Sequence, residues 1–432
     1  MTSSPHLVVV YDRGAANVSE IAKALTKVAP LVFVTKQGSE HAELLLPLLR
    51  DMGEVVTFQN TPEEVVGRLR TISLGGITTF SEAMLLETAE LAAELGLPYH
   101  SRHTARLLTD KFLQRQRLNE TGTGSVAGWL LTRPEDWPEA LRHVNLPVIV
   151  KPLRGEGSRN THRVDSFEEG LRLVTQLLAV EPALVVEHFL TGRPCHPYGD
   201  YVSVESITCR GVISHIAVTG KFPLIPPFRE TGQFWPAPLS NEEQQSLRDL
   251  AGAAIRSLGI TTGITHTEIK LTGSGPRVIE VNGRLGGNIN ELSIRAAGLD
   301  MVELAGRVAL GEVVETDPVT QGRVVFQYSN PAPPYPCRLS SVSGQRQLRN
   351  TEGITGYRVW IRPGTPINGG VSTHELDLIL GEAEDHAGVM ELLSEALGLL
   401  TFTFTSTVSE SSVEISALEL PTVGGSLNTK WH

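Results

Sequence analysis

The sequence has few of the residues that mark secreted or membrane proteins. Of its 432 residues only three are cysteines, Cys195, Cys209 and Cys337, and no two of them form a C-x-x-C pair. A disulfide framework or a thiolate zinc site is therefore not expected, and a reducing compartment fits best. No apolar run approaches the roughly 18–20 residues that span a bilayer, and the N-terminus has no basic leader segment. These absences predict a cytoplasmic protein without a membrane partner.

Basic charge and aromatic side chains are also scarce. The formal net charge is -11 at pH 7, and only 6% of the residues are aromatic. An acidic chain of this kind lacks the basic face that coats nucleic acid, so a nucleic-acid partner is not expected. With 41% hydrophobic and 20% charged residues the composition is that of an ordinary globular protein, and a chain of this length requires more than one core.

The order of strand-like and helical patterns predicts a division into several parts. Over residues 1–105, short β-rich runs such as His6–Tyr11 alternate with helical spacing of apolar residues, as in Val18–Val28 and Phe80–Leu95. This alternation predicts parallel βαβ units in a doubly wound α/β domain. Mixed patterns follow, and the chain is again β-rich from about residue 320. We therefore expect an N-terminal α/β domain over 1–105 and a C-terminal α+β domain over 316–432. The division of the part between them into α+β subdomains over 106–190 and 191–315 is implied by the family resemblance described below.

A predicted β-hairpin carries a set of oxygen ligands. If its turn centres on Ser274, Glu268 lies opposite Glu280 and His266 lies opposite Asn282, with all four side chains on one face. Like charges opposed at about 4.5–5.5 Å destabilise a strand pair, so a cation between the two carboxylates is expected. Carboxylate and amide oxygens suit Mg²⁺, with Mn²⁺ as an alternative.

The hairpin could instead present these side chains to solvent as an ordinary outer face. Its apolar neighbours Ile269 and Val281 favour a buried hairpin. Arg284 follows Asn282 by two residues, before a glycine-rich stretch, and its guanidinium can hold phosphate oxygens in a fork of donors. The hairpin and this arginine together predict a site for metal-bound phosphates.

A lysine and a glycine loop give a weaker signal for a nucleotide-binding site. Lys151 ends a β-rich run just before the loop Arg154–Arg159, whose glycines let backbone N–H groups approach phosphates. This loop matches neither the Walker pattern nor the dinucleotide fingerprint. Lys111 lies at a predicted helix start, and Glu187 lies at a predicted strand end. Many proteins have such residues without binding a nucleotide, so neither residue alone indicates a nucleotide site.

In their order and spacing these residues resemble the ATP-grasp superfamily, over roughly residues 70–310. The most specific piece is the run from Ile279 to Gly287. The resemblance implies the ATP-grasp fold, in which two α+β subdomains hold ATP between them. The implied ATP-binding residues are Lys111, Lys151, Gly155, Gly157, Ser158, Glu187, His188, Phe189 and Leu190. The implied metal ligands are Glu268, Glu280 and Asn282, and the implied catalytic residues are Arg284, Lys151 and Arg295; for Arg295 a salt bridge between helices is an equal alternative.

Within the superfamily the chain looks most like the L-amino acid ligases, which make dipeptides, often for antibiotics. The implied substrate-binding residues are Glu82, Lys221, Glu230, Gln233, Arg284, Gly287 and Asn288. In those ligases a histidine follows the acid of the substrate loop, and a bulky residue follows the arginine. Here Gln233 and Asn288 stand at the corresponding positions. The identity of the carboxylate and of the amine therefore stays open.

The resemblance implies a two-step reaction on small-molecule substrates. A carboxylate attacks the γ-phosphate of ATP, giving an acyl phosphate and ADP, and an amine then displaces phosphate. The loops Arg154–Arg159 and Phe222–Gln233 are candidate lids, with ordinary surface loops as the alternative. A homodimer is compatible with the resemblance.

Two other functions remain open: a carboxylating or purine-pathway type of ligase that phosphorylates bicarbonate or another metabolic carboxylate, and a non-catalytic nucleotide-binding protein. The second is expected to lose a metal ligand or Arg284, and none is missing.

Overall fold

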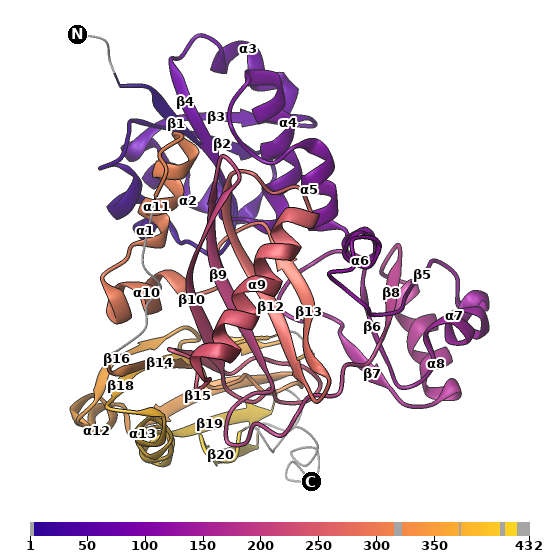
Figure 1. Ribbon diagram of the computed structural model, residues 1–432. Coiled ribbons are helices and arrows are strands. Elements are labelled where there is room, and N and C mark those ends of the chain that lie inside the picture. Colours follow the sequence, from indigo (N-terminus) through magenta and orange to yellow (C-terminus); the bar gives the residue numbers. More distant parts are fainter. Residues whose placement is uncertain (1–3, 315–321, 371–372, 407–410, 421–432) are drawn as a thin grey trace.

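The structure is a computed structural model that describes residues 4–314, 322–370, 373–406 and 411–420. The described strands form four sheets, and helices cover them in layers (Figure 1). Within these residues, no helix is both long and apolar enough to cross a membrane.

The N-terminal sheet confirms the expected parallel βαβ arrangement. Its strands run parallel in the order β3-β2-β1-β4. They are β1 (His6–Val10), β2 (Leu31–Lys36), β3 (Gly53–Phe58) and β4 (Leu74–Thr78). The connecting helices include α1 (Val18–Leu25), α2 (Glu40–Met52) and α4 (Leu85–Leu95). The expected helix over Phe80–Leu95 begins later, because Glu82–Met84 form a separate 3₁₀ turn, and it ends at Gly96 with φ 68°.

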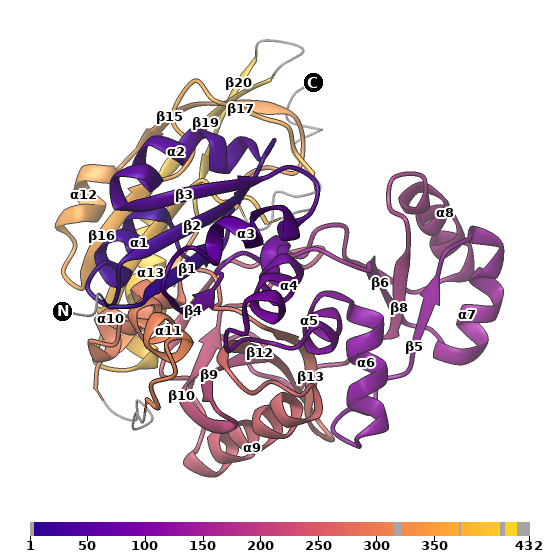
Figure 2. The same cartoon turned by 90° about the horizontal axis from the view of Figure 1, so that it is seen from above.

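One face of this sheet is completed by a helix from a distant part of the chain. Helix α11 (Met301–Ala309) buries Val302 and Val308 in one core with Leu7 and Leu25 (Figure 2). A Cβ atom on Gly76 of β4 would lie 2.3 Å from the carbonyl oxygen of Ala309, so only glycine permits this approach. The N-terminal domain therefore depends on residues near 300 for its packing.

The small subdomain lies to one side of the molecule, as Figure 2 shows. Its antiparallel sheet has the order β5-β8-β6-β7. The strands are β5 (Gly128–Leu131), β6 (Val148–Pro152), β7 (His162–Val164) and β8 (Leu184–His188). Helices α7 (Trp137–Val144) and α8 (Phe167–Leu178) pack on it, with Trp137 fully buried. Helices α5 (Arg102–Thr109) and α6 (Lys111–Glu120) connect this subdomain to the N-terminal domain.

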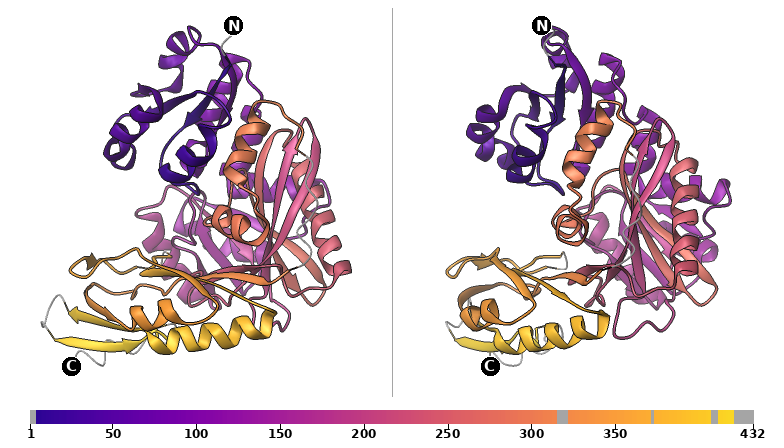
Figure 3. Two further views of the ribbon diagram at one scale, coloured as in Figure 1. Left: turned by 90° about the vertical axis from the view of Figure 1, so that its left-hand side faces the viewer. Right: turned by 60° about the vertical axis from the view of Figure 1, so that its left-hand side comes forward.

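The central sheet has eight strands in the order β13-β12-β9-β10-β11-β14-β18-β16. The strands that precede residue 316 are β9 (Tyr201–Cys209), β10 (Val212–Lys221), β11 (Gly232–Trp235), β12 (Gly263–Thr272) and β13 (Gly275–Asn282). Helix α9 (Asn241–Ser257) covers one face. The strands that follow are β14 (Val324–Tyr328), β16 (Ile354–Val359) and β18 (Asp377–Ala383). The expected C-terminal domain is thus joined to the central subdomain by a continuous hydrogen-bonded sheet (Figure 3).

The rest of the C-terminal part forms a smaller layer on this sheet. Its sheet has the order β17-β15-β19-β20. The elements are β15 (Cys337–Ser343), α12 (Gln345–Asn350), β17 (Pro366–Ile367), α13 (His386–Leu399), β19 (Thr401–Ser406) and β20 (Ser412–Ser416). Their core includes Phe402 and Phe404 together with Phe222 and Phe234 of the central subdomain.

The predicted pairing across the β12–β13 hairpin is confirmed, although its turn differs. Glu268 pairs with Glu280, and His266 pairs with Asn282. Thr272 pairs with Gly275, so the turn has two residues and does not centre on Ser274. A β-bulge at Ile279 adds one residue to β13 and brings the carboxylates back into the predicted register.

Candidate active site

The oxygen ligands of the hairpin face a lysine from the neighbouring helix. Asp110 caps α6, and Lys111 is the first residue of that helix. The ammonium group of Lys111 forms an ion pair and a hydrogen bond with Glu280. Glu268 lies opposite Glu280, and its Oε1 is 3.6 Å from Nε2 of His266. The structure therefore brings Lys111 to the predicted metal ligands.

The donor set fits a magnesium ion that also binds phosphate. Among the described residues, no three His, Cys, Asp or Glu side chains form a metal-binding group. Glu268 and Glu280 contribute two carboxylates, and Asn282 lies on the same face with its amide. Mg²⁺ is commonly held by one or two carboxylates, with water and substrate phosphates as its other ligands. The protein thus supplies part of a coordination shell, as expected if a nucleotide supplies the rest.

Lys151 is held by a buried carboxylate in the small subdomain. Its Nζ lies 2.7 Å from Oε2 of Glu187, while Nε of Arg115 lies 2.9 Å from Oε1. Burial raises the pKa of Glu187, but Arg115 and Lys151 outweigh burial and lower this pKa to about 2. The carboxylate thus positions two cations, and the expected role of Glu187 in binding ATP stays a prediction. Arg115 was not predicted; it lies one helical turn after Lys111, a spacing that signals a shared helix face.

His188, Phe189 and Leu190, which the resemblance implies bind ATP, follow Glu187 directly. The N–H group of His188 donates to the carbonyl of Ala127, and that of Phe189 donates to the carbonyl of Pro147, each at 3.0 Å. The guanidinium of Arg163 lies 4.4 Å from the centre of the Phe189 ring. These two backbone donors are engaged here, so nucleotide binding by His188, Phe189 and Leu190 stays a prediction.

The glycine loop between β6 and β7 folds over Arg284. Gly155, Gly157 and Ser158 have φ values of 123°, 65° and 53°. This left-handed conformation favours glycine and gives the loop its tight curve. Glu156 accepts a hydrogen bond of 3.0 Å from Nη2 of Arg284. The loop therefore places a carboxylate where the resemblance predicts a transferred phosphoryl group.

Arg284 is buried and its hydrogen bonding is incomplete. Its Nε lies 3.2 Å from Oε2 of Glu82, yet among the described residues neither atom has a hydrogen-bond partner. Burial raises the pKa of Glu82 to about 7, although Arg284 acts to lower it. A buried guanidinium with an unmet donor suits an anionic ligand.

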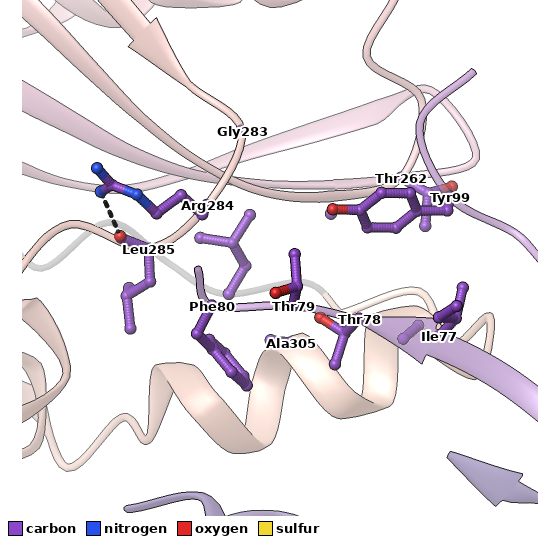
Figure 4. A pocket seen from close by; sticks show the side chains of 13 residues that line it. Ile77, Thr78, Thr79, Phe80, Tyr99, Thr262, Gly283, Arg284, Leu285 and Ala305 are labelled. Carbon is purple, nitrogen blue, oxygen red and sulfur yellow. Dashed lines mark hydrogen bonds between the residues drawn. The ribbon is translucent and has the colours of Figure 1, made fainter. Parts of the chain in front are cut away.

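A small cavity of about 20 Å³ lies behind this arginine (Figure 4). It separates the end of β4 from the segment Gly283–Leu285, and Arg284 donates to the Leu285 carbonyl at 2.9 Å. The hydroxyl of Tyr99 at the cavity has no hydrogen-bond partner among the described residues. This volume has room for about one water molecule.

The predicted substrate residues form a second polar group on the central sheet. Nζ of Lys221 donates to Oε1 of Gln233 at 2.9 Å and lies 6.0 Å from the centre of the Tyr201 ring. Tyr201 in turn donates its hydroxyl to Glu230 at 3.3 Å. Lys221 is only 4% exposed, and it forms no ion pair with any described residue. Glu205 and Glu268 lie near enough for the charge of Lys221 to lower their pKa values, but neither forms an ion pair with it, so its ammonium group is available to a negatively charged ligand.

Two glutamines connect this group to the helix α10 (Ile289–Ala297). Gln233 donates to the Gly287 carbonyl at 2.9 Å and to Oε1 of Gln327 at 3.2 Å. Gln327 donates to the Asn288 carbonyl at 3.0 Å and to the Glu291 carboxylate. A lysine only donates and a carboxylate only accepts, so the two ends of the chain set the orientation of both amides. Gln327 and Glu291 were not predicted.

Arg295 forms the salt bridge that was the alternative to a catalytic role, although with a residue of its own helix. It binds Glu291 at 2.6 Å, and it also donates to the carbonyls of Phe326 at 2.9 Å and Gly381 at 3.0 Å. All three guanidinium nitrogens are thus used in joining α10 to β14 and β18. These contacts lend no support to the predicted role of Arg295 on the phosphoryl group.

Comparisons with known proteins agree with this geometry. Residues 110–288 match the ATP-grasp domain family. The chain is 29% identical over 262 residues to the alanine–anticapsin ligase of Bacillus subtilis (strain 168), which covers 56% of this chain and 55% of that protein. It is 28% identical over 284 residues to carnosine synthase 1 of Homo sapiens, covering 60% of this chain and 34% of that protein. The chain thus spans about half or less of the length of these curated relatives.

Solved structures with the same fold cover nearly the whole chain. The L-amino acid ligase from Bacillus licheniformis superposes with a TM-score of 0.75 at 19% sequence identity, and the match covers 93% of this chain and 98% of that one. The described part of the chain, including the continuous sheet, therefore has the fold of the ATP-grasp proteins.

Proposed function

From the match of residues 110–288 to the ATP-grasp domain family, we propose that this protein is an ADP-forming ligase that joins an amino acid to a second amino acid by an amide bond. The observation that carries the proposal is the pair Glu268 and Glu280, opposed on one sheet face beside Lys111 and Arg284. Phosphoryl transfer is catalysed mainly by positioning and by neutralising charge, and this group supplies both.

The first step would take place at the hairpin. Glu268, Glu280 and Asn282 would hold magnesium, which when bound neutralises phosphate charge and orients the oxygens. Lys111 and Lys151 would bind ATP, the loop with Gly155, Gly157 and Ser158 would cover the phosphates, and Glu187–Leu190 would contact the nucleoside. Arg284 has an unmet buried donor that could hold an oxygen of the transferred phosphoryl group. The carboxylate oxygen of one substrate would form a bond to the γ-phosphorus, and ADP would leave.

The second substrate would bind at Lys221, Tyr201 and Glu230. Lys221 lacks an ion-pair partner among the described residues, and Glu230 lies beyond the hydroxyl of the same tyrosine ring. A zwitterionic amino acid would give its carboxylate to Lys221 and its ammonium group to Glu230. Glu82, Gln233, Gly287 and Asn288 complete the proposed pocket. Gln233 stands where the resemblance to the L-amino acid ligases implies a histidine, so the choice of amino acids stays open.

The test measures ADP and phosphate release with ATP, Mg²⁺ and pairs of amino acids. We expect release that requires both amino acids, with a dipeptide detected by mass spectrometry. Glu280→Gln should abolish release, because it removes a metal ligand, while circular dichroism shows an intact fold. Full activity of Glu280→Gln would refute the metal assignment. Release that requires bicarbonate instead of a second amino acid would favour a carboxylating ligase.

A further inference from the structure

Glu375 lies beside the proposed amine pocket and comes from the C-terminal part of the chain. It precedes β18 and forms a backbone bridge with Pro331. The hydroxyl of Ser329 and the carboxylate of Glu230 lie near enough to the Glu375 carboxylate to affect its pKa, the first lowering it and the second raising it. Ser329 follows Gln327 by two residues in extended backbone, so both side chains face the same side. Glu375 is therefore on the side where Gln327 meets Gln233 and Lys221.

The segment that carries Glu375 is tied to both candidate lids. The hydroxyl of Thr373 accepts a hydrogen bond of 3.3 Å from the N–H group of Glu230. The N–H group of Thr373 donates to the carbonyl of Gly157 at 3.2 Å. The glycine loop Arg154–Arg159 and the substrate loop Phe222–Gln233 thus both contact Thr373, two residues before Glu375.

No cation neutralises this pair of acids within the part of the chain that the structure describes. Neither Glu230 nor Glu375 forms an ion pair there. The pocket also holds the buried cation Lys221, which forms no ion pair with a described residue, although its charge lowers the pKa of Glu205 and of Glu268. Unpaired charges of both signs at one site are unfavourable without a ligand of complementary charge. Lys221 is thus an independent indication, besides the acids, that a charged ligand binds here.

The environment of Glu375 makes it suitable for accepting a proton. Burial is the main cause that raises its pKa to about 7, and the charges of Glu230 and Asp377 act in the same direction. The Ser329 hydroxyl acts to lower the pKa. These are the titratable groups that face Glu375 from the substrate loop and from β18. A base with a pKa near the operating pH transfers protons most effectively.

We propose that Glu375 accepts the proton which the ammonium group of the second substrate, bound beside Glu230, must lose before it attacks the acyl phosphate. This inference rests on the proposed ligase function. The ammonium N–H bond breaks, and the proton moves to the Glu375 carboxylate. The free amine then forms the C–N bond to the acyl carbon. The bond between this carbon and the bridging oxygen of the acyl phosphate breaks, and phosphate leaves with that electron pair. Phosphate takes the second amine proton, and Glu375 returns its proton to solvent.

The test compares two nucleophiles in the full-length protein. Hydroxylamine is uncharged at neutral pH and can capture the acyl phosphate as a hydroxamate without giving up a proton first. An amino acid is cationic at its amine and needs the base. We expect Glu375→Gln to reduce kcat for dipeptide formation about 100-fold or more, while hydroxamate formation stays within about twofold of wild type. Glu375→Asp should recover part of the lost activity. The control is Glu384→Gln, because Glu384 is 84% exposed and should not affect either reaction.

Each outcome separates this inference from the proposed function. Equal dipeptide rates for wild type and Glu375→Gln would overturn the role of Glu375 and leave the ligase function standing. An equal loss of both products would also overturn it, because a structural defect affects both nucleophiles alike. If wild type forms neither ADP nor hydroxamate with any amino acid, the proposed function itself fails, and the inference fails with it.

Discussion

Among single residues, Glu187 has the clearest structural effect, because it is buried and binds two cations. Glu187→Gln should lower the free energy of unfolding by about 3 kcal/mol, since it leaves Arg115 and Lys151 buried without a carboxylate. Urea unfolding measures this loss. Glu139→Gln is the control: Glu139 of α7 is partly exposed and pairs with surface residues only, so its replacement should change stability by less than about 0.5 kcal/mol. A similar loss in both variants would contradict the assignment.

The stabilisation by Glu187 should also depend on pH. Its pKa is lowered from 4.5 to about 2 in the folded protein, so the unfolded chain binds the proton more readily. The contribution is complete above the unfolded pKa and is lost as pH falls toward 2. The difference in unfolding free energy between wild type and Glu187→Gln should therefore be constant near pH 7 and shrink below about pH 4.5. A difference that does not change with pH would contradict this account.

At the level of the element, the packing of α8 on α7 requires a glycine. A Cβ atom at Gly170 would lie 2.0 Å from Cζ2 of the buried Trp137. Gly170→Ala should therefore destabilise the protein by about 1–3 kcal/mol, measured by urea unfolding. In Gly398→Ala, by contrast, the nearest atom to the new Cβ is 3.8 Å away, and that change in α13 should be neutral or stabilising by up to about 1 kcal/mol. The opposite signs distinguish packing from helix propensity.

A substitution in the glycine loop should change the KM for ATP. Glu156 is half exposed and binds Arg284, so it competes with the phosphate expected there. Glu156→Gln should lower the KM for ATP about two- to fivefold, in line with the value of about 0.2–1 kcal/mol for such pairs. Steady-state kinetics measures this change, with Glu168→Gln in the first turn of α8 as the control. A higher KM in Glu156→Gln would show that the loop carboxylate assists binding.

The hairpin shows how far a single sequence predicts an element. A turn centred on Ser274 placed Glu268 opposite Glu280; the structure confirms that pair, but it reaches this register through a different turn and a bulge. The bulge at Ile279 was not predicted, because no residue pattern distinguishes the extra residue from a regular strand position. Arg115, Gln327 and Glu375 were missed for a different reason: their partners are distant in the sequence, and only the folded arrangement of strands, loops and helices brings them together.

At the scale of the whole molecule, the four predicted parts follow one another along the chain as expected. They are not independently packed domains, because they share hydrophobic cores and one sheet. The sequence predicted the parallel N-terminal sheet from local alternation. It did not predict that α11 would cover this sheet, because about two hundred residues separate the two. A packing contact over such a separation leaves no local pattern.

The covering of the N-terminal sheet by α11 predicts how a fragment will behave. Residues 1–105 alone would expose Leu7, Leu25 and their neighbours, which are buried against α11 in the full chain. This fragment should therefore lack a cooperative thermal transition and should bind a hydrophobic dye. Adding residues 289–314 through a flexible linker should restore a transition. A stable fragment without these residues would show that the domain folds independently.

The continuity of the central sheet also limits how related ligases can exchange parts. A chimera joined at residue 316 would take β11 from one protein and β14 from another, although these strands are neighbours in one sheet. A transplanted C-terminal part would need to match the register of its host strand and the phenylalanine packing around Phe222 and Phe234. It would also bring a foreign residue to the position of Glu375. Recombination that preserves activity should therefore carry β11 and the substrate loop together with the C-terminal part, as one inherited block.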